Sequence, residues 1–385
     1  MHVSAVTDVG RARVNNEDAF TIRDLATGEK IEESGAQQAI DVLDHGVLLA
    51  LSDGMGGAEA GEVASALVLE SLHAALASGA PAKGAIDEQL EAAVLRANQQ
   101  VLEAARSENR RGMGATLTAL FVRGDEAYIA EVGDSRGYLL RKGRLRQITR
   151  DQSLVQLLVD QGVMSPEEAR TSTNKNVILQ AVGLSSDVRV AIARLRLRRG
   201  DRVLLCSDGV SNAISDAELL QIVAQSDPRN ACQTMIALAN DRGGDDNQTA
   251  IVADLVGDGL PLPDEFETVT ETYEVLQAFE VGTSSSEEPP RRRRATTPDR
   301  PAMAANAELA EGEAEPAKVA PARAPTPTPE PEPATAGRPS GEPNHDGLPR
   351  QVAHPAAPTT ARIGLVIAIG VIIAALTAIA LRLVV

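Results

Sequence analysis

Hydrophobic positions in the first two-thirds of the chain follow two periods, one typical of helices and one typical of strands. Helical spacing extends over residues 58–78 and 85–106, where apolar side chains recur every three or four positions. Between residues 114 and 148, short apolar runs alternate with tight turns, which predicts strands. Ser-x-x-Glu capping boxes at Ser165 and Ser215 predict the starts of two further helices. Strands and helices that come in groups favour an α+β fold, in which helices cover stacked antiparallel sheets.

Five short segments place carboxylates at turns beside predicted strands. The apolar runs at residues 47–54 and 203–209 both end in Ser-Asp-Gly, which indicates a buried strand with a carboxylate at its end. Three further acidic turns lie at residues 15–18, 133–135 and 245–247, and no histidine or cysteine stands in these turns or in the two Ser-Asp-Gly turns. A single Asp-Gly turn is most often structural. Repetition of the turn at strand ends favours a shared site instead.

Oxygen donors of this kind predict a site for hard divalent cations, which prefer carboxylates, backbone carbonyls and water. Two such ions about 3.5–4 Å apart clamp an in-line displacement at phosphorus and activate the attacking water. The acidic turns therefore predict a magnesium- or manganese-dependent hydrolase.

The acidic turns belong to a longer series of motifs that resembles the metal-dependent serine/threonine protein phosphatases, the type 2C-like family, in bacterial form. Seven motifs follow the family's order within residues 1–255, which makes a chance match negligible. The resemblance implies a four-layer αββα sandwich, with two antiparallel sheets flanked by helices, over this catalytic domain. The motifs are Asp8–Phe20, Ser52–Gly57, Gly114–Thr118, Val132–Arg136, Thr149–Asp151, Ser207–Val210 and Asp245–Asn247.

The resemblance also implies a set of metal ligands. Asp53 would bridge two ions, and Asp208 and Asp246 would complete the shell of the first ion. Glu17 and the backbone carbonyl of Gly54 would bind the second ion. The ions implied are Mn²⁺ or Mg²⁺, with two in the core site.

Further roles follow from the same resemblance. Asp134, together with Asp208, would form a weaker third metal site. Arg13 would bind the substrate phosphate, because a guanidinium group matches two phosphate oxygens at once. Asp18 would hold water molecules that are bound to the metals. The catalytic residues implied are therefore Arg13, Asp18, Asp53 and Asp208.

Two positions depart from the wider family. Met55 stands where animal members carry a histidine that is thought to protonate the leaving group, and methionine cannot transfer a proton. Bacterial members commonly carry Met there, so activity is still expected. Gln152 stands where many relatives have histidine. A covalent phosphoenzyme is not expected, because neither Cys206 nor Cys232 is followed by arginine six residues later, as in tyrosine phosphatases.

These inferences favour the hydrolysis of phosphoserine and phosphothreonine in proteins by a water activated between two metal ions. The expected partners are serine/threonine kinases and their phosphorylated substrates. A net charge of −17 argues against nucleic acid as a partner. Two other classes of protein are possible. A catalytically silent phosphoprotein-binding module would have lost metal-binding positions. A membrane-tethered structural protein would leave the acidic turns unexplained.

The last third of the chain has a different composition. Residues 256–361 are acidic and rich in Pro and Ala, which predicts a disordered linker that includes a candidate docking or phosphorylation segment at 265–281 and a basic run at Arg291–Arg294. Residues 363–381 are uncharged and, at 1.5 Å per residue, are long enough to cross a hydrocarbon core of about 30 Å. Residues 362–385 are therefore predicted to form a single transmembrane anchor in the cell membrane. The N-terminus has no signal segment, so we expect a cytoplasmic catalytic domain.

Overall fold

The computed structural model describes most of the first 281 residues. These are residues 1–31, 34–42, 44–56, 60–77, 86–106 and 110–281. They belong to one compact unit, Met1–Arg291. The predicted linker beyond residue 281, the basic run at Arg291–Arg294 and the predicted transmembrane span lie outside the described residues.

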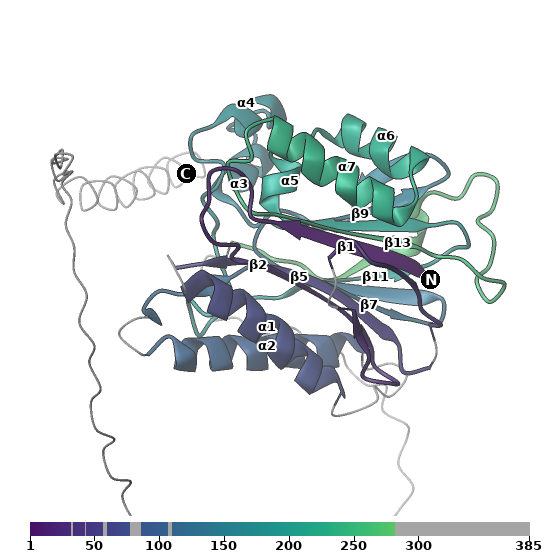
Figure 1. The fold of residues 1–385 in the computed structure, drawn as a ribbon, viewed down its shortest axis with the longest axis horizontal. Coiled ribbons are helices and arrows are strands. Elements are labelled where there is room, and N and C mark those ends of the chain that lie inside the picture. Colours follow the sequence, from purple (N-terminus) through teal and green to yellow (C-terminus); the bar gives the residue numbers. More distant parts are fainter. Residues whose placement is uncertain (32–33, 43, 57–59, 78–85, 107–109, 282–385) are drawn as a thin grey trace, which may run out of the picture. The chain divides into compact units, whose positions relative to one another are not determined.

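Two antiparallel sheets lie face to face in the middle of this unit, and helices cover their outer faces (Figure 1). The first sheet has six strands, in the order β10 (Arg144–Gln147), β9 (Arg136–Arg141), β12 (Arg202–Cys206), β13 (Gln248–Asp254), β1 (His2–Asp8) and β4 (Gln37–Ala39). The second sheet has the order β14 (Tyr273–Gln277), β11 (Ala191–Arg196), β8 (Glu126–Val132), β7 (Leu117–Arg123), β5 (Val47–Met55), β2 (Asp18–Asp24) and β3 (Lys30–Ile31), with the short β6 (Gly114–Ala115) paired to β5.

The helices form the two outer layers. The long helices α1 (Ala60–Ala77) and α2 (Ile86–Ala104) cover the second sheet, and α5 (Asp208–Ser211), α6 (Asp216–Gln225) and α7 (Pro228–Asp241) cover the first (Figure 1). Two short helices, α3 (Leu154–Asp160) and α4 (Pro166–Thr171), follow β10 in the chain, and α8 (Val269–Thr272) precedes β14. The predicted stack of antiparallel sheets with helices on both outer faces is confirmed.

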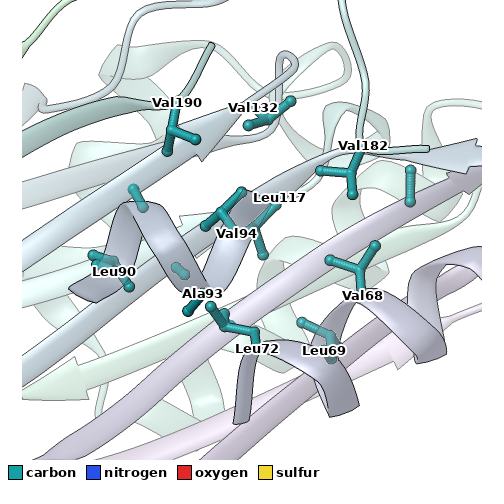
Figure 2. Packing of buried hydrophobic residues seen from close by; sticks show 14 of the residues in the cluster. Val68, Leu69, Leu72, Leu90, Ala93, Val94, Leu117, Val132, Val182 and Val190 are labelled. Carbon is teal, nitrogen blue, oxygen red and sulfur yellow. The ribbon is translucent and has the colours of Figure 1, made fainter. Parts of the chain in front are cut away.

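Strand β5 shows why the central strands read as continuous apolar runs. Its side chains alternate between two buried layers: Leu48 and Ala50 pack in the cluster under α1 and α2, whereas Leu49 and Leu51 pack between the two sheets. A strand that is covered on both faces needs apolar residues at every position. Figure 2 shows the cluster under the helices, where Leu72 of α1 and Val94 of α2 lie among side chains of the sheet.

Most local predictions are confirmed. The helices expected at 58–78 and 85–106 are α1 and α2, and both capping boxes are present before α4 and α6. At the first box, the Ser165 hydroxyl accepts a hydrogen bond from the Glu168 N–H, and the Glu168 carboxylate accepts one from the Ser165 N–H. Helix α7 was not predicted. Its start is marked by Asp227, which caps the helix, and by Pro228 in the first turn.

Helix α1 is the one helix in the described part of the chain that is long and apolar enough to cross a membrane. Half of it is buried inside the unit, where Val68 and Leu72 belong to the hydrophobic cluster under the second sheet. Its apolar character is therefore explained by packing in the core.

The sequence pattern ended the catalytic domain at residue 255, and the structure extends this boundary. Strand β14 pairs with β11 and becomes the edge of the second sheet. The Tyr273 hydroxyl donates to the Ile148 carbonyl at 3.0 Å, and Val269 is buried between the sheets. The predicted linker is therefore wrong for residues 269–277, because the backbone of β14 pairs with β11 and the Val269 and Tyr273 side chains pack against the core between the sheets at this end of the sandwich. That end is visible only once both sheets are assembled.

Candidate active site

The acidic turns, separated in sequence by up to 230 residues, meet around one cavity of about 410 Å³. Seven of the eight predicted site residues line it, and Asp18 lies behind them, with 8 % of its surface exposed. Met55 also lines the cavity, whereas Gln152 does not. The lining residues are Arg13, Glu17, Asp53, Gly54, Met55, Gly56, Thr116, Asp134, Asn176, Ile178, Asp208, Asp246 and Asn247.

Strands β2 and β5 bring two of the carboxylates together. Asp18 at the start of β2 lies opposite Asp53 near the end of β5 in the antiparallel register. One oxygen of Asp18, Oδ2, accepts hydrogen bonds from the hydroxyls of Ser207 and Thr249, each at 2.8 Å. The other, Oδ1, is buried without a partner among the described residues. Asp18 is therefore held in place through Oδ2, whereas Oδ1 remains an acceptor without a donor from any described residue.

The serines of the two Ser-Asp-Gly turns hold the turns in place. The Ser52 hydroxyl donates to the Thr116 carbonyl at 2.6 Å, and the Asp53 N–H donates to the Thr116 hydroxyl at 3.0 Å. In the second turn, the Ser207 hydroxyl donates to Asp18 and accepts from the Thr249 N–H at 2.9 Å. These contacts cross between distant strands. Sequence reasoning identified the aspartates and missed the positioning role of the serines.

The glycine after Asp53 is required by close packing. A Cβ atom at Gly54 would lie 2.1 Å from the carbonyl oxygen of Gly61, and one at Gly61 would lie 2.5 Å from Oε2 of Glu17. The Gly54 N–H donates to the Glu17 carbonyl at 3.1 Å. The end of β5, the first turn of α1 and the Glu17 loop thus pack backbone to backbone, which brings the Gly54 and Glu17 oxygens to one side of the cavity.

Asn247 is a second positioning residue that the sequence alone did not reveal. Its side-chain carbonyl accepts from the Glu17 N–H at 2.8 Å, and its amide group donates to the carbonyls of Val9 and Asn15, both at 2.9 Å. This one side chain fixes the loop that carries Arg13 and Glu17. An Asn after Asp246 therefore has a clear structural purpose.

Arg13 lies at the mouth of the cavity with its side chain half-exposed. Its guanidinium donates to the Asp246 carboxylate at 2.9 Å. The predicted phosphate-binding group is thus paired with a predicted metal ligand. A second anion can compete for it, because the exposed guanidinium has further donors.

Burial and mutual repulsion raise the pKa of several carboxylates at this site. Burial, followed by repulsion from neighbouring carboxylates, raises the pKa of Asp53 and of Asp134 well above the usual range. Burial also raises the pKa of Asp18 to about 7, and burial with the nearby Asp246 raises that of Asp208 to about 6. Burial raises the pKa of Glu17 as well. So many acids in one place stay ionised only if cations compensate their charge.

The donor set fits hard divalent cations. All candidate ligands are oxygens, and Asp208 Oδ1 is buried without a hydrogen-bond partner in the described part of the chain. Across the described ranges, no three His, Cys, Asp or Glu side chains are close enough to hold an ion by themselves. A bound ion would therefore also need the Gly54 carbonyl and water, which hard cations accept readily.

The two departures from the family pattern have different positions. The Met55 side chain faces the cavity and carries no group that could transfer a proton. Gln152 is buried beside the turn at residues 133–135, which we call the catalytic loop, and its side-chain carbonyl accepts from the Gly133 N–H at 2.7 Å. Gln152 therefore supports the loop of Asp134. Cys206 and Cys232 are buried and unpaired, and burial raises the pKa of both thiols to about 12, which excludes a thiolate nucleophile at neutral pH.

Residues 152–182 contribute one wall of the cavity. They contain α3, α4 and an irregular stretch in which Asn176 and Ile178 face the cavity. The stretch is attached by isolated bridges, Ser153 to Ile178 and Ala115 to Val182.

The fold and the carboxylate site define the class of serine/threonine protein phosphatases. The family "Protein phosphatase 2C" matches residues 35–240, more than half of the chain. The chain belongs to the protein phosphatase 2C family.

Similar proteins agree with this assignment. The serine/threonine protein phosphatase PstP of Mycobacterium tuberculosis is 39% identical over 257 residues, which cover 66% of this chain and 45% of PstP. The chain thus spans less than half the length of that relative. The serine/threonine phosphatase stp of Listeria monocytogenes is 34% identical over 258 residues, which cover 66% of this chain and 96% of stp.

Solved structures show the same fold. The crystal structure of the M. tuberculosis phosphatase PstP/Ppp has a TM-score of 0.57 at 38% identity and covers 66% of this chain and 98% of its own. The catalytic domain of a PstP in complex with two manganese ions has a TM-score of 0.55 at 37% identity, with the same coverage.

Proposed function

We propose that this chain hydrolyses phosphoserine and phosphothreonine in proteins, at a site that holds two Mn²⁺ or Mg²⁺ ions. The observation that supports the proposal most directly is the convergence of Glu17, Asp53, Asp208 and Asp246 on one cavity with Arg13 at its mouth. The manganese ions in the related PstP structure support the same choice of metal. A catalytically silent binding module has less support, because every predicted metal donor lines the cavity.

The resemblance to the family suggests the ligands, and all of them line the cavity. Asp53 would contribute to the binding of both ions. Asp208 and Asp246 would hold one ion, and Glu17 with the Gly54 carbonyl the other, while Asp134 with Asp208 would serve a weaker third site. When bound, the ions supply a water activated for attack and neutralise charge on the phosphoryl oxygens.

The side chains of the chain itself would then orient the substrate. Arg13 would exchange its contact with Asp246 for two phosphate oxygens, which aligns phosphorus for in-line attack. Asp18 would accept hydrogen bonds from water in the cavity through its free Oδ1 while Ser207 and Thr249 hold Oδ2. Met55 cannot protonate the departing alkoxide, so the proton would come from water.

We further propose that the enzyme acts at the cytoplasmic face of the cell membrane on serine/threonine kinases and their substrates. The uncharged run at residues 363–381 supports an anchor. About 80 residues separate it from the described domain. Treated as a coil, they span on the order of 50 Å, which is enough to reach the cytoplasmic parts of neighbouring membrane proteins.

The activity is tested with residues 1–291 and a phosphothreonine peptide. Hydrolysis should require added manganese or magnesium and should stop in EDTA, and Asp53→Asn should lower turnover by orders of magnitude. Asp245→Asn is the matched control, because Asp245 does not line the cavity. Full turnover after exhaustive chelation would disprove the two-metal site.

The location is tested separately. The full chain should fractionate with membranes and should dephosphorylate a co-embedded membrane kinase faster than residues 1–291 at equal concentration. Both forms should act equally on a soluble peptide. Equal rates on the membrane kinase would disprove a role for the anchor.

A further inference from the structure

A second cavity, of about 780 Å³, opens between the two sheets at the edge formed by β10 and β14. It is larger than the catalytic cavity and shares none of its lining residues. Its floor comes from β8, and its walls come from β11, β14, helix α3 and the loop that follows β10. Apolar side chains line much of it, among them Ile129, Ile148, Leu157 and Val275.

One buried carboxylate in this cavity has an unused oxygen. Glu131 of β8 lines the cavity, and only 4 % of the residue is exposed. Its Oε2 accepts from the Arg150 N–H at 2.9 Å, whereas Oε1 has no hydrogen-bond partner among the described residues. A buried carboxylate with a free oxygen is costly unless a donor reaches it.

The other aspartates that line the cavity already have arginine partners. Asp151 accepts two hydrogen bonds from the Arg136 guanidinium, with Nη2 at 2.7 Å, and Asp160 pairs with Arg150 at 2.5 Å. The Arg150 side chain is therefore committed to Asp160, and only its backbone N–H serves Glu131. Arg146 also lines the cavity and donates to the Thr270 hydroxyl, and Glu280 in the lining is exposed. Glu131 is therefore the buried carboxylate left to pair with a positive group that enters the cavity.

We propose that this cavity binds a small organic cation, an amidinium, guanidinium or ammonium group on an apolar body. The cationic group pairs with Glu131, and the apolar body packs against Ile129, Ile148 and Leu157. A planar forked donor suits a carboxylate best, because it makes charge-assisted hydrogen bonds to the free oxygen. A few convergent polar groups inside an apolar cavity are the usual composition of a small-molecule site.

Binding at Glu131 has a direct route to the catalytic loop. The Gln152 side-chain amide donates to the backbone carbonyl of Glu131 at 3.2 Å, and the Gln152 side-chain carbonyl accepts from the Gly133 N–H at 2.7 Å. Gly133 immediately precedes Asp134. A ligand that shifts Glu131 therefore alters the hydrogen bond of the Gly133 amide, two contacts away.

The test uses the full chain in detergent micelles with saturating magnesium, which occupies the acidic catalytic cavity. Isothermal titration calorimetry compares benzamidine with its neutral isostere benzamide. Benzamidine should bind at least about tenfold more tightly, and Glu131→Gln should remove that advantage. Glu126→Gln is the matched control on the same strand. Glu126 pairs with Arg194 outside this cavity, so its loss should leave benzamidine binding unchanged.

A second variant tests the cavity independently, in case Glu131→Gln fails to fold. Ala191 of β11 lines the cavity, so Ala191→Phe should fill the space and weaken benzamidine binding while Glu131 stays in place. In ¹⁵N-glycine spectra, benzamidine should shift the Gly133 amide in the wild type and not in Glu131→Gln. Equal binding of benzamidine and benzamide, or binding unaffected by both variants, overturns the site. Binding without a shift of Gly133 overturns the route to the catalytic loop.

Discussion

Replacing Asp208 by asparagine should abolish activity and, at neutral pH, stabilise the metal-free domain. The pKa of Asp208 is raised from 3.8 to about 6, first by burial and then by repulsion from Asp246. Below pH 3.8 the group is protonated in both the folded and the unfolded state, so it costs nothing. Between pH 3.8 and about 6 the unfolded state releases this proton while the folded state still holds it, so stability falls as the pH rises; above pH 6 both states are ionised and the loss is complete.

The magnitude follows from that shift. A rise from 3.8 to about 6 corresponds to about 3 kcal/mol of destabilisation above pH 6. Water reaches Asp208 from the cavity and screens part of the repulsion. We therefore expect Asp208→Asn to raise the free energy of unfolding by about 1–3 kcal/mol at pH 7.5 in EDTA, and by little at pH 4.

Urea denaturation of residues 1–291 measures this difference. Magnesium at about 100 times its dissociation constant should stabilise the wild type by about 2.7 kcal/mol, and Asp208→Asn should gain much less. Asp245→Asn, outside the cavity, should behave like the wild type. The reasoning is refuted if Asp208→Asn is less stable than the wild type at pH 7.5 in EDTA, or if its effect is the same at pH 4.

Three further predictions concern other parts of the unit. Arg13→Ala should mainly raise KM for a phosphopeptide, since phosphate is bound in ground and transition states alike. If neither KM nor kcat changes, the assignment of Arg13 to the phosphate site is wrong. Gly61→Ala should raise the manganese concentration for half-maximal activity, because its Cβ would lie 2.5 Å from Glu17 Oε2; an unchanged titration would contradict this packing. Asp201→Ala should cost about 3–5 kcal/mol in urea unfolding, because it leaves the buried Arg141 guanidinium without its carboxylate partner; a loss under 1 kcal/mol would show that other contacts or water compensate the charge.

The predictions that succeeded depend on short-range order. Helices α1 and α2 follow from a spacing of three and four residues, and the helix after Ser165 follows from a capping box four residues long. Asp53 and Asp208 were found because an apolar run that ends in Ser-Asp-Gly identifies a strand end. These signals lie within short stretches of sequence, so they can be read without knowing the tertiary contacts. The roles of the aspartates in metal binding stay predictions.

The features that were missed depend on contacts between distant residues. Ser207 bonds to Asp18 across 189 residues, and Asn247 holds the Glu17 loop across 230. Strand β14 looked like linker because its apolar residues are few, and only its backbone pairing with the edge strand β11 incorporates it into the sheet. The cavity at Glu131 is formed at the edge where the two sheets separate, by residues that are distant in sequence.

The sequence by itself therefore determined most of the helices and central strands, the family and the acidic donors, because periodicity, caps and strand-end carboxylates are patterns of neighbouring positions. Only the tertiary structure decided which oxygens face one another, which are bonded and which remain free. The physical reason is that burial and hydrogen-bond partners, which set the charge and position of Asp18, Asp208 and Glu131, come from strands far away in the chain.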